Sequence, residues 1–130
     1  MIRTKLKTII ILFQISILIA ACSHWKDDKL IDEISEVTKS SLPETCILLV
    51  ISEQNCYNCY TKWLEKADKN TIGIAVSSNL NFYKNLKENY PKIEWHYTES
   101  TNIHRIINNE IKPFGPFKIQ IKDSEILNVE

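Results

Sequence analysis

The sequence CILLVISEQNCYNC, residues 46–59, places two cysteines directly after an apolar run and a short polar segment. Residues 46–51 lack polar alternation, which is typical of a strand buried on both faces of a sheet. Residues 52–55 are expected to form the loop that leaves the sheet, with Asn55 as the N-cap of a helix. That helix is expected to run to about Asp68, because apolar residues recur at helical spacing: Tyr60, Trp63, Leu64 and Ala67.

Cys56 and Cys59 therefore stand at the predicted start of a helix, two residues apart. Unpaired N–H groups and the positive end of the helix dipole favour a thiolate at the first sulfur. Cys59 follows one turn later on the side of Trp63, so we expect it to face inward. This arrangement predicts one accessible and one covered sulfur that can alternate between dithiol and disulfide.

The N-terminal segment has the pattern of a secretory signal. Arg3, Lys5 and Lys7 form a basic region, and residues 8–19 are almost wholly apolar but short for a transmembrane span. Ile19-Ala20-Ala21-Cys22 resembles the lipobox of bacterial lipoproteins. That resemblance implies cleavage before Cys22 and a lipid on its sulfur. The alternative is an ordinary signal peptide that is cleaved near Ala21.

The expected organisation is a lipoprotein signal peptide at residues 1–21, a lipid-anchored tether at 22–28 and one domain at 29–130. The lipid on Cys22 would attach the protein to a membrane of the bacterial cell envelope, facing the periplasm. Ser23 stands where an aspartate resembles an inner-membrane retention signal, so the outer membrane is slightly favoured. An envelope compartment also permits disulfide bonds.

The charge balance bears on the class of partner, and Cys46 is the cysteine that remains outside the pair and the lipidation site. The chain has 16 basic and 16 acidic residues, and removal of the signal would leave 13 basic residues against 16 acidic ones. This balance does not favour a nucleic-acid partner. Cys46 opens the apolar run and is expected to be a small buried hydrophobe.

The rest of the chain predicts alternating helices and strands. A helix is expected at residues 28–40, and 46–51 with 71–76 would form a βαβ unit. An edge strand at 93–98 and a final hairpin of 117–121 with 126–129 would complete a central mixed sheet. The fold class is therefore α/β, with a sheet flanked by helices and ending in a β-hairpin. Two further helices are expected at 80–89, capped near Asn79, and from Thr101 or Asn102 to Ile111.

A strand, a CxxC pair at a helix start, a βαβ unit and a final hairpin entered through proline resemble the thioredoxin-like superfamily. The added strand and helix between Lys92 and Ile111 make the chain similar to membrane-tethered TlpA-like thiol:disulfide oxidoreductases. The resemblance implies that Cys56 attacks a substrate disulfide, that Cys59 resolves the mixed disulfide, and that a cis-proline lies against the pair. Pro116 matches that proline, with Pro113 as the alternative. The implied partners are thiols or disulfides of exported proteins and an unidentified redox partner, and no cofactor is implied.

The chain also departs from this family at several positions. Asn55 replaces the usual tryptophan before the first cysteine, and Val50 replaces a buried acidic residue. The family normally adds a last helix after the hairpin, which covers one sheet face. Either the helix at 28–40 is expected to cover that face here, or the protein is short of the family's usual form. The alternative function is a non-enzymatic interaction module in which the Cys56 to Cys59 bridge is structural.

A metal site is the other alternative for the cysteine pair. Two cysteines at this spacing supply half of a zinc site, which His96 or His104 would have to complete. Neither histidine has a ligand-like spacing to another candidate, and both are expected at the surface. The sequence therefore predicts no metal.

Overall fold

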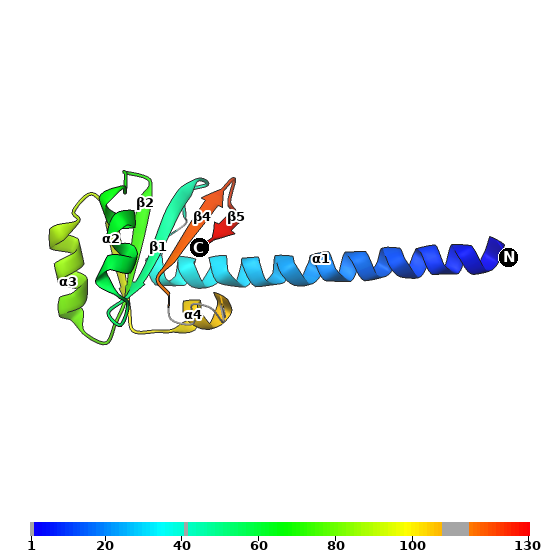
Figure 1. The fold of residues 1–130 in the computed structure, drawn as a ribbon, viewed down its shortest axis with the longest axis horizontal. Coiled ribbons are helices and arrows are strands. Elements are labelled where there is room, and N and C mark those ends of the chain that lie inside the picture. The colour runs from blue at the N-terminus through cyan, green and yellow to red at the C-terminus, as the bar shows by residue number, and fades with distance from the viewer. Residues whose placement is uncertain (1, 41, 108–114) are drawn as a thin grey trace.

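The computed structural model describes residues 2–40, 42–107 and 115–130, and the side chains of all of these except 17–26. Nine helices and strands occur within this part of the chain (Figure 1). The order of elements confirms the predicted α/β class. They are α1 (Ile2–Thr38), β1 (Cys46–Ser52), α2 (Tyr57–Glu65), β2 (Thr71–Val76), α3 (Leu80–Asn89), β3 (Glu94–Thr98), α4 (Asn102–Ile107), β4 (Phe117–Lys122) and β5 (Glu125–Val129).

The five strands form one mixed sheet in the order β3-β2-β1-β4-β5. β1, β2 and β3 are parallel, and β4 and β5 continue the sheet in antiparallel fashion. β1 is central and buried along most of its length, as its unbroken apolar run predicts. The predicted terminal hairpin is also present. Asp123 and Ser124 form its turn with φ of 53° and 63°, the left-handed geometry that matches the twist of paired strands.

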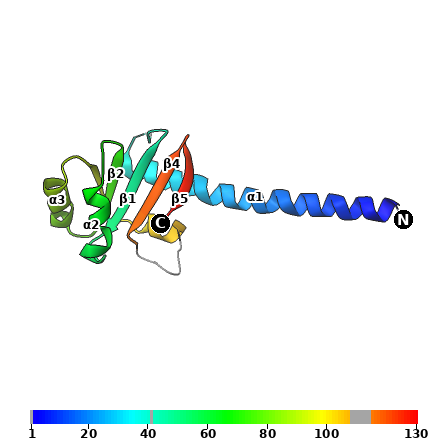
Figure 2. The same ribbon diagram turned by 45° about the horizontal axis from the view of Figure 1, so that its top comes forward.

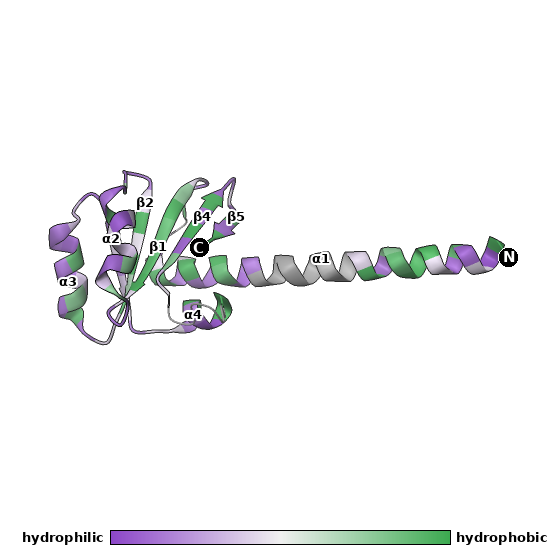
Figure 3. Ribbon diagram, in the orientation of Figure 1, coloured by the Kyte–Doolittle hydropathy of each residue, from purple (hydrophilic) through white to green (hydrophobic). Residues whose placement is uncertain are grey.

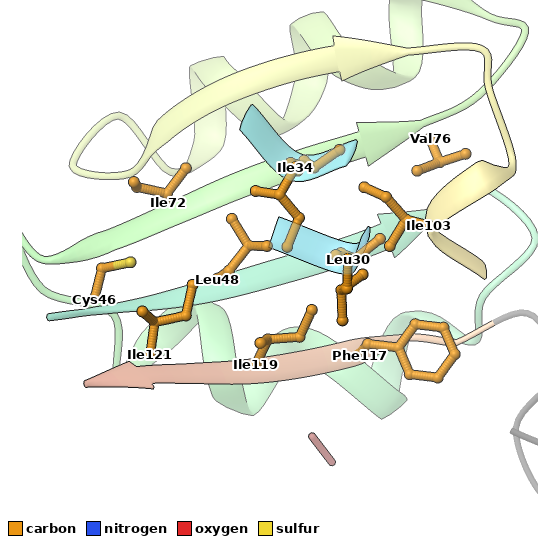
Figure 4. Close-up of a cluster of buried hydrophobic side chains, with 12 residues drawn as sticks. Leu30, Ile34, Cys46, Leu48, Ile72, Val76, Ile103, Phe117, Ile119 and Ile121 are labelled. Carbon is orange, nitrogen blue, oxygen red and sulfur yellow. The ribbon is translucent and has the colours of Figure 1, made fainter. Parts of the chain in front are cut away.

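Alternate side chains of the strands build two cores on opposite faces of the sheet. On one face, Leu30 and Ile34 of α1 and Ile103 of α4 pack on β1, β2 and β4 (Figure 4). On the other face, α2 and α3 contribute Tyr60, Leu64 and Leu86. The molecule therefore has three layers, with α1 and α4 on one side and α2 and α3 on the other (Figure 2).

α1 differs from the expected helix at 28–40 because it is one continuous helix from residue 2. No glycine or proline interrupts residues 2–38, so nothing in the backbone ends the helix at the expected tether, 22–28. Lys39, with φ of 52°, ends it. The last turns cover the sheet face, which was the first of the two alternatives, and the first turns extend away from the domain (Figure 1).

The described side chains of residues 2–16 are exposed, and those of 9–13 and 15 are apolar. Figure 3 colours this part of α1 mainly as hydrophobic. Among the described residues, no helix combines the length and the apolar character needed to cross a membrane.

Two other helix ends differ from expectation. α2 ends at Glu65 rather than near Asp68, because the Asp68 side chain accepts the N–H of Asn70 and joins a turn that leads into β2. The helix expected to reach Ile111 is described as α4 only to Ile107, and Ile111 lies outside the described residues.

Candidate functional site

The loop between β1 and α2 carries the cysteine pair to the carboxyl end of the central strand. Asn55 closes this loop and does not cap the helix as expected. Its side-chain oxygen accepts the N–H of Ser52 at 2.8 Å, and its own N–H donates to the Ser52 carbonyl at 2.9 Å. Because Asn55 forms this turn, the N-cap of α2 is Cys56, which has an extended conformation with φ of −60° and ψ of 125°.

Cys56 and Cys59 are both exposed, and no disulfide joins them in this structure. The expectation that Cys59 would be covered is therefore wrong. α2 buries Tyr60 and Leu64, and Cys59 lies beside this stripe, where the first turn meets solvent. Its N–H donates to the Cys56 carbonyl at 2.9 Å, which holds the two residues in one turn.

The pKa of the Cys56 thiol is lowered. The first cause is a hydrogen bond from the Cys59 side chain, followed by a hydrogen bond from the Cys59 backbone N–H. Desolvation acts in the opposite direction, and the Asn58 N–H adds a weaker lowering effect. Because thiolates rather than thiols attack disulfides, the lowered pKa favours the reactive form of the Cys56 sulfur.

Cys46 lies in a different environment. It is 3% exposed and packs in the core between α1 and the sheet (Figure 4). Burial raises the pKa of its thiol, which disfavours the reactive form. This confirms the prediction that Cys46 is a small buried hydrophobe.

Three tyrosines surround the first turn of α2, an arrangement that the sequence analysis missed. Tyr57, between the cysteines, is 64% exposed and meets the Tyr60 ring edge-on, with ring centroids 5.9 Å apart. A hydrogen bond joins the side chains of Tyr57 and Tyr90, and this bond, with desolvation and nearby charges, raises the pKa of Tyr90 to about 12. Tyr90 comes from the end of α3, so only the folded chain reveals this contact.

Pro116 stands where β4 approaches the carboxyl end of β1. The Gly115–Pro116 peptide bond is cis, as expected for Pro116. The next residue, Phe117, pairs with Val50, so Pro116 lies beside the strand end that leads into the cysteine loop. Pro113 lies outside the described residues. Val50, which pairs with Phe117, is fully buried.

A pocket of about 260 Å³ opens at the carboxyl ends of β1, β2 and β3. Glu53 and Gln54 from the cysteine loop form one wall, and Glu99 with Thr101 belongs to the segment after β3. We call this hollow the carboxyl-end pocket. It was not predicted, but parallel α/β sheets commonly bind ligands at this edge.

Hydrogen bonds hold the two carboxylates of the carboxyl-end pocket in place. The Ser77 hydroxyl donates to Glu53 Oε2 at 2.7 Å, and the Tyr97 hydroxyl donates to Glu99 Oε1 at 3.2 Å. The pKa of Tyr97 is raised by desolvation first, then by the hydrogen bond and charge of Glu99 and by the charge of Glu53. Both carboxylates thus raise the pKa of the same phenol, so they lie in one electrostatic environment.

His96 and His104 are less exposed than expected. His104 is 6% exposed, lines the carboxyl-end pocket, and its ring lies 5.3 Å from that of Phe117. The surface position expected for it is wrong, because α4 packs this face onto the sheet together with Ile103. The His96 side chain is 19% exposed, with Nε2 3.5 Å from Glu94 Oε1. Among the described residues, no three His, Cys, Asp or Glu side chains form a group that could hold a metal ion.

The structure thus brings Cys56 and Cys59 together and places Pro116 at the end of the neighbouring strand pair. Cys22, the expected lipidation site, is among the residues whose side chains are not described. No protein-family profile, no curated protein and no solved structure matches the chain.

Proposed function

We propose that the protein is an envelope thiol:disulfide oxidoreductase that acts through Cys56 and Cys59. The observation that carries this proposal is an exposed thiol at a helix N-cap whose pKa is lowered by a second exposed thiol in the same turn. A buried structural cysteine has the opposite properties, which Cys46 displays in the same molecule.

The reaction conserves electrons between the protein and its substrate. The Cys56 thiolate attacks one sulfur of a substrate disulfide, forms a mixed disulfide and releases the first substrate thiolate, which takes a proton from water. Cys59 then loses its proton and attacks the Cys56 sulfur, which releases the second substrate thiolate. The substrate gains two electrons, and the protein ends as a Cys56–Cys59 disulfide that a dithiol partner must reduce.

We propose a thioredoxin-like fold as the setting for this chemistry. The supporting features are the parallel β1-α2-β2 unit, the CxxC pair at the start of α2, and the terminal β4–β5 hairpin that follows Pro116. The final part of α1, with α4, covers the sheet face that is opposite α2. The proposed substrates are disulfides or dithiols of exported proteins.

We also propose that a lipid on Cys22 anchors the protein to the cell envelope. The protein would face the periplasm, and the outer membrane is slightly favoured over the inner membrane. The basic residues before position 8, the apolar residues that follow and the Ile19-Ala20-Ala21-Cys22 sequence support this location. Radiolabelled fatty acid should be incorporated into the full chain and not into Cys22→Ala. Equal labelling of both proteins would contradict the anchor.

The exchange activity is tested with substitutions of each cysteine. Cys56→Ser should abolish reduction of insulin or 2-hydroxyethyl disulfide, because the nucleophile is lost. Cys59→Ser should accumulate mixed disulfides on Cys56, because the resolving sulfur is lost. Cys46→Ala is the matched control and should retain activity. Equal turnover by the Cys56→Ser/Cys59→Ser protein would contradict the proposed function.

A further inference from the structure

The carboxyl-end pocket lies within reach of any polypeptide that is bound at Cys56. Gln54 forms part of its wall and precedes Cys56 by two residues, so their Cα atoms are within about 7 Å. A polypeptide whose cysteine reacts at Cys56 can therefore bring its neighbouring side chains to the pocket.

The size of the pocket favours a single side chain as the occupant. Its volume of about 260 Å³ is just below the range of about 300–1,000 Å³ that is usual for small-molecule sites. Val76 and the largely buried His104 supply apolar and aromatic surface at the same place as the polar groups. Such a mixed lining suits a long aliphatic stem that ends in a polar head.

The charge of the pocket favours a cation over an anion. Glu53 and Glu99 line it, and none of its described lining residues is Lys or Arg. Neither carboxylate forms an ion pair with another residue that the structure describes. Their hydrogen-bond donors, the hydroxyls of Ser77 and Tyr97, are neutral, so the negative charge is left uncompensated. A phosphate or carboxylate ligand would be repelled here.

We propose that the carboxyl-end pocket is a specificity subsite that binds a Lys or Arg side chain close to the reacting cysteine of the substrate polypeptide. This inference rests on the proposed exchange reaction at Cys56 and adds a substrate class to it. Lys and Arg carry donors only and an aliphatic stem, which complements two acceptor carboxylates in a pocket that Val76 and His104 also line. Glu53 and Glu99 are thus residues that select the substrate.

The test compares disulfide-linked dimers of short blocked peptides as substrates of the reduced full chain. One series carries a single Lys at each position within three residues of the cysteine, and the matched series carries norleucine there. In at least one position the Lys peptide should oxidise the Cys56/Cys59 pair up to about fivefold faster, which is the upper end of the effect of one exposed ion pair. Higher salt should weaken this preference, because the carboxylates are near solvent.

Variants then connect the preference to the pocket. Glu53→Gln/Glu99→Gln should bring the ratio of the Lys rate to the norleucine rate close to one, and Gln at position 53 can still accept the Ser77 hydroxyl. Glu44→Gln/Glu125→Gln removes the same charge at the opposite end of the sheet and should keep the preference. Because each result is a ratio within one variant, a general change in thiol reactivity cancels.

Failure of this inference and failure of the proposed function give different results. If the protein reacts with 2-hydroxyethyl disulfide but treats Lys and norleucine peptides alike, the subsite is wrong and the exchange function stands. A preference that survives in Glu53→Gln/Glu99→Gln also overturns the subsite. If the protein reacts with neither the small disulfide nor any peptide, the proposed function fails and the subsite fails with it.

Discussion

Cys56 and Cys46 belong to the same chain, but their positions in the fold shift the pKa values of their thiols in opposite directions. The Cys56 sulfur lies in solvent at the first turn of α2 and accepts hydrogen bonds that stabilise its thiolate. The Cys46 sulfur lies in the core, where burial stabilises the protonated thiol. Alkylation is therefore expected to select Cys56 in the native protein.

Substitution of Cys59 tests the largest contribution to the lowered pKa of Cys56. Cys59→Ala removes the side-chain donor, so the pH midpoint of Cys56 alkylation by iodoacetamide should rise and the rate at neutral pH should fall several-fold. Cys59→Ser keeps a hydroxyl donor at the same place and should shift the midpoint less. Fragment ions that locate the label on Cys56 provide the measurement, and Cys46 should stay unlabelled until the protein unfolds.

The direction of the pH effect follows from thiolate chemistry. A lowered pKa increases the fraction of thiolate below the ordinary cysteine value of about 8.5, and loss of the donor moves the reactive range upward. Identical midpoints in Cys59→Ala and the unsubstituted protein would show that the Cys59 side chain does not stabilise the Cys56 thiolate.

At the scale of single residues, the sequence predicted the features that depend on local pattern. The position of Cys56 at a helix start and the burial of Cys46 follow from neighbouring residues. The cap at Asn55, the exposure of Cys59 and the burial of His104 were misjudged. Each of these features depends on whether the residue joins a local turn or packs against a segment that is distant in sequence. The sequence pattern does not distinguish these two arrangements.

Strands and helices were more predictable than single side chains. The unbroken apolar runs predicted β1 and β2, and the Asn79 cap predicted the start of α3, where its side chain accepts the N–H of Asn81. The length of α1 was not predicted. The sequence was interpreted as a signal peptide, a tether and a separate helix, but the backbone of residues 2–38 is helical throughout. The proposed cleavage before Cys22 would depend on recognition by a peptidase and would not alter helix propensity.

Gly73 fits β2 to its neighbour β3 through a close contact. The Trp95 ring lies against the Gly73 backbone, and a Cβ atom at position 73 would overlap that ring. Trp95 is 6% exposed, and its indole N–H donates to the Tyr90 carbonyl at 3.1 Å, so the ring has little freedom to move. Glycine is therefore required here by space in the sheet rather than by a turn.

Gly73→Ala should lower the free energy of unfolding by about 1–3 kcal/mol, the usual cost of overpacking a core. Urea denaturation measures this as a lower midpoint with an unchanged slope. In a Trp95→Leu background the same substitution should cost much less, because the overlapping ring is gone. An equal cost in both backgrounds would contradict a steric role for Trp95.

At the scale of the whole molecule, the sheet places the candidate sites on one edge. The cysteine loop, the strand end beside Pro116 and the carboxyl-end pocket all lie where β1 ends, while two helical layers cover the faces. Element order predicted the α/β class, the central strand and the terminal hairpin. The pocket could not be predicted, since its lining residues lie at or after the ends of three different strands that only the folded topology brings together.

The alternative to exchange chemistry is a module in which the Cys56 to Cys59 bridge only stabilises the fold. The two accounts differ in how strongly the dithiol form is favoured. Hydrogen bonds that stabilise the Cys56 thiolate favour the reduced state, which makes the corresponding disulfide a better oxidant. A structural disulfide has no such stabilisation of its reduced form.

The reduction potential of the Cys56/Cys59 couple in the full chain is the most direct test of the proposed exchange function. Equilibration in dithiothreitol redox buffers, followed by thiol labelling and mass spectrometry, measures it. We expect a potential above about −300 mV, within the range that cellular dithiol partners can reduce. A potential at or below about −300 mV would identify a structural bridge and contradict the proposed function.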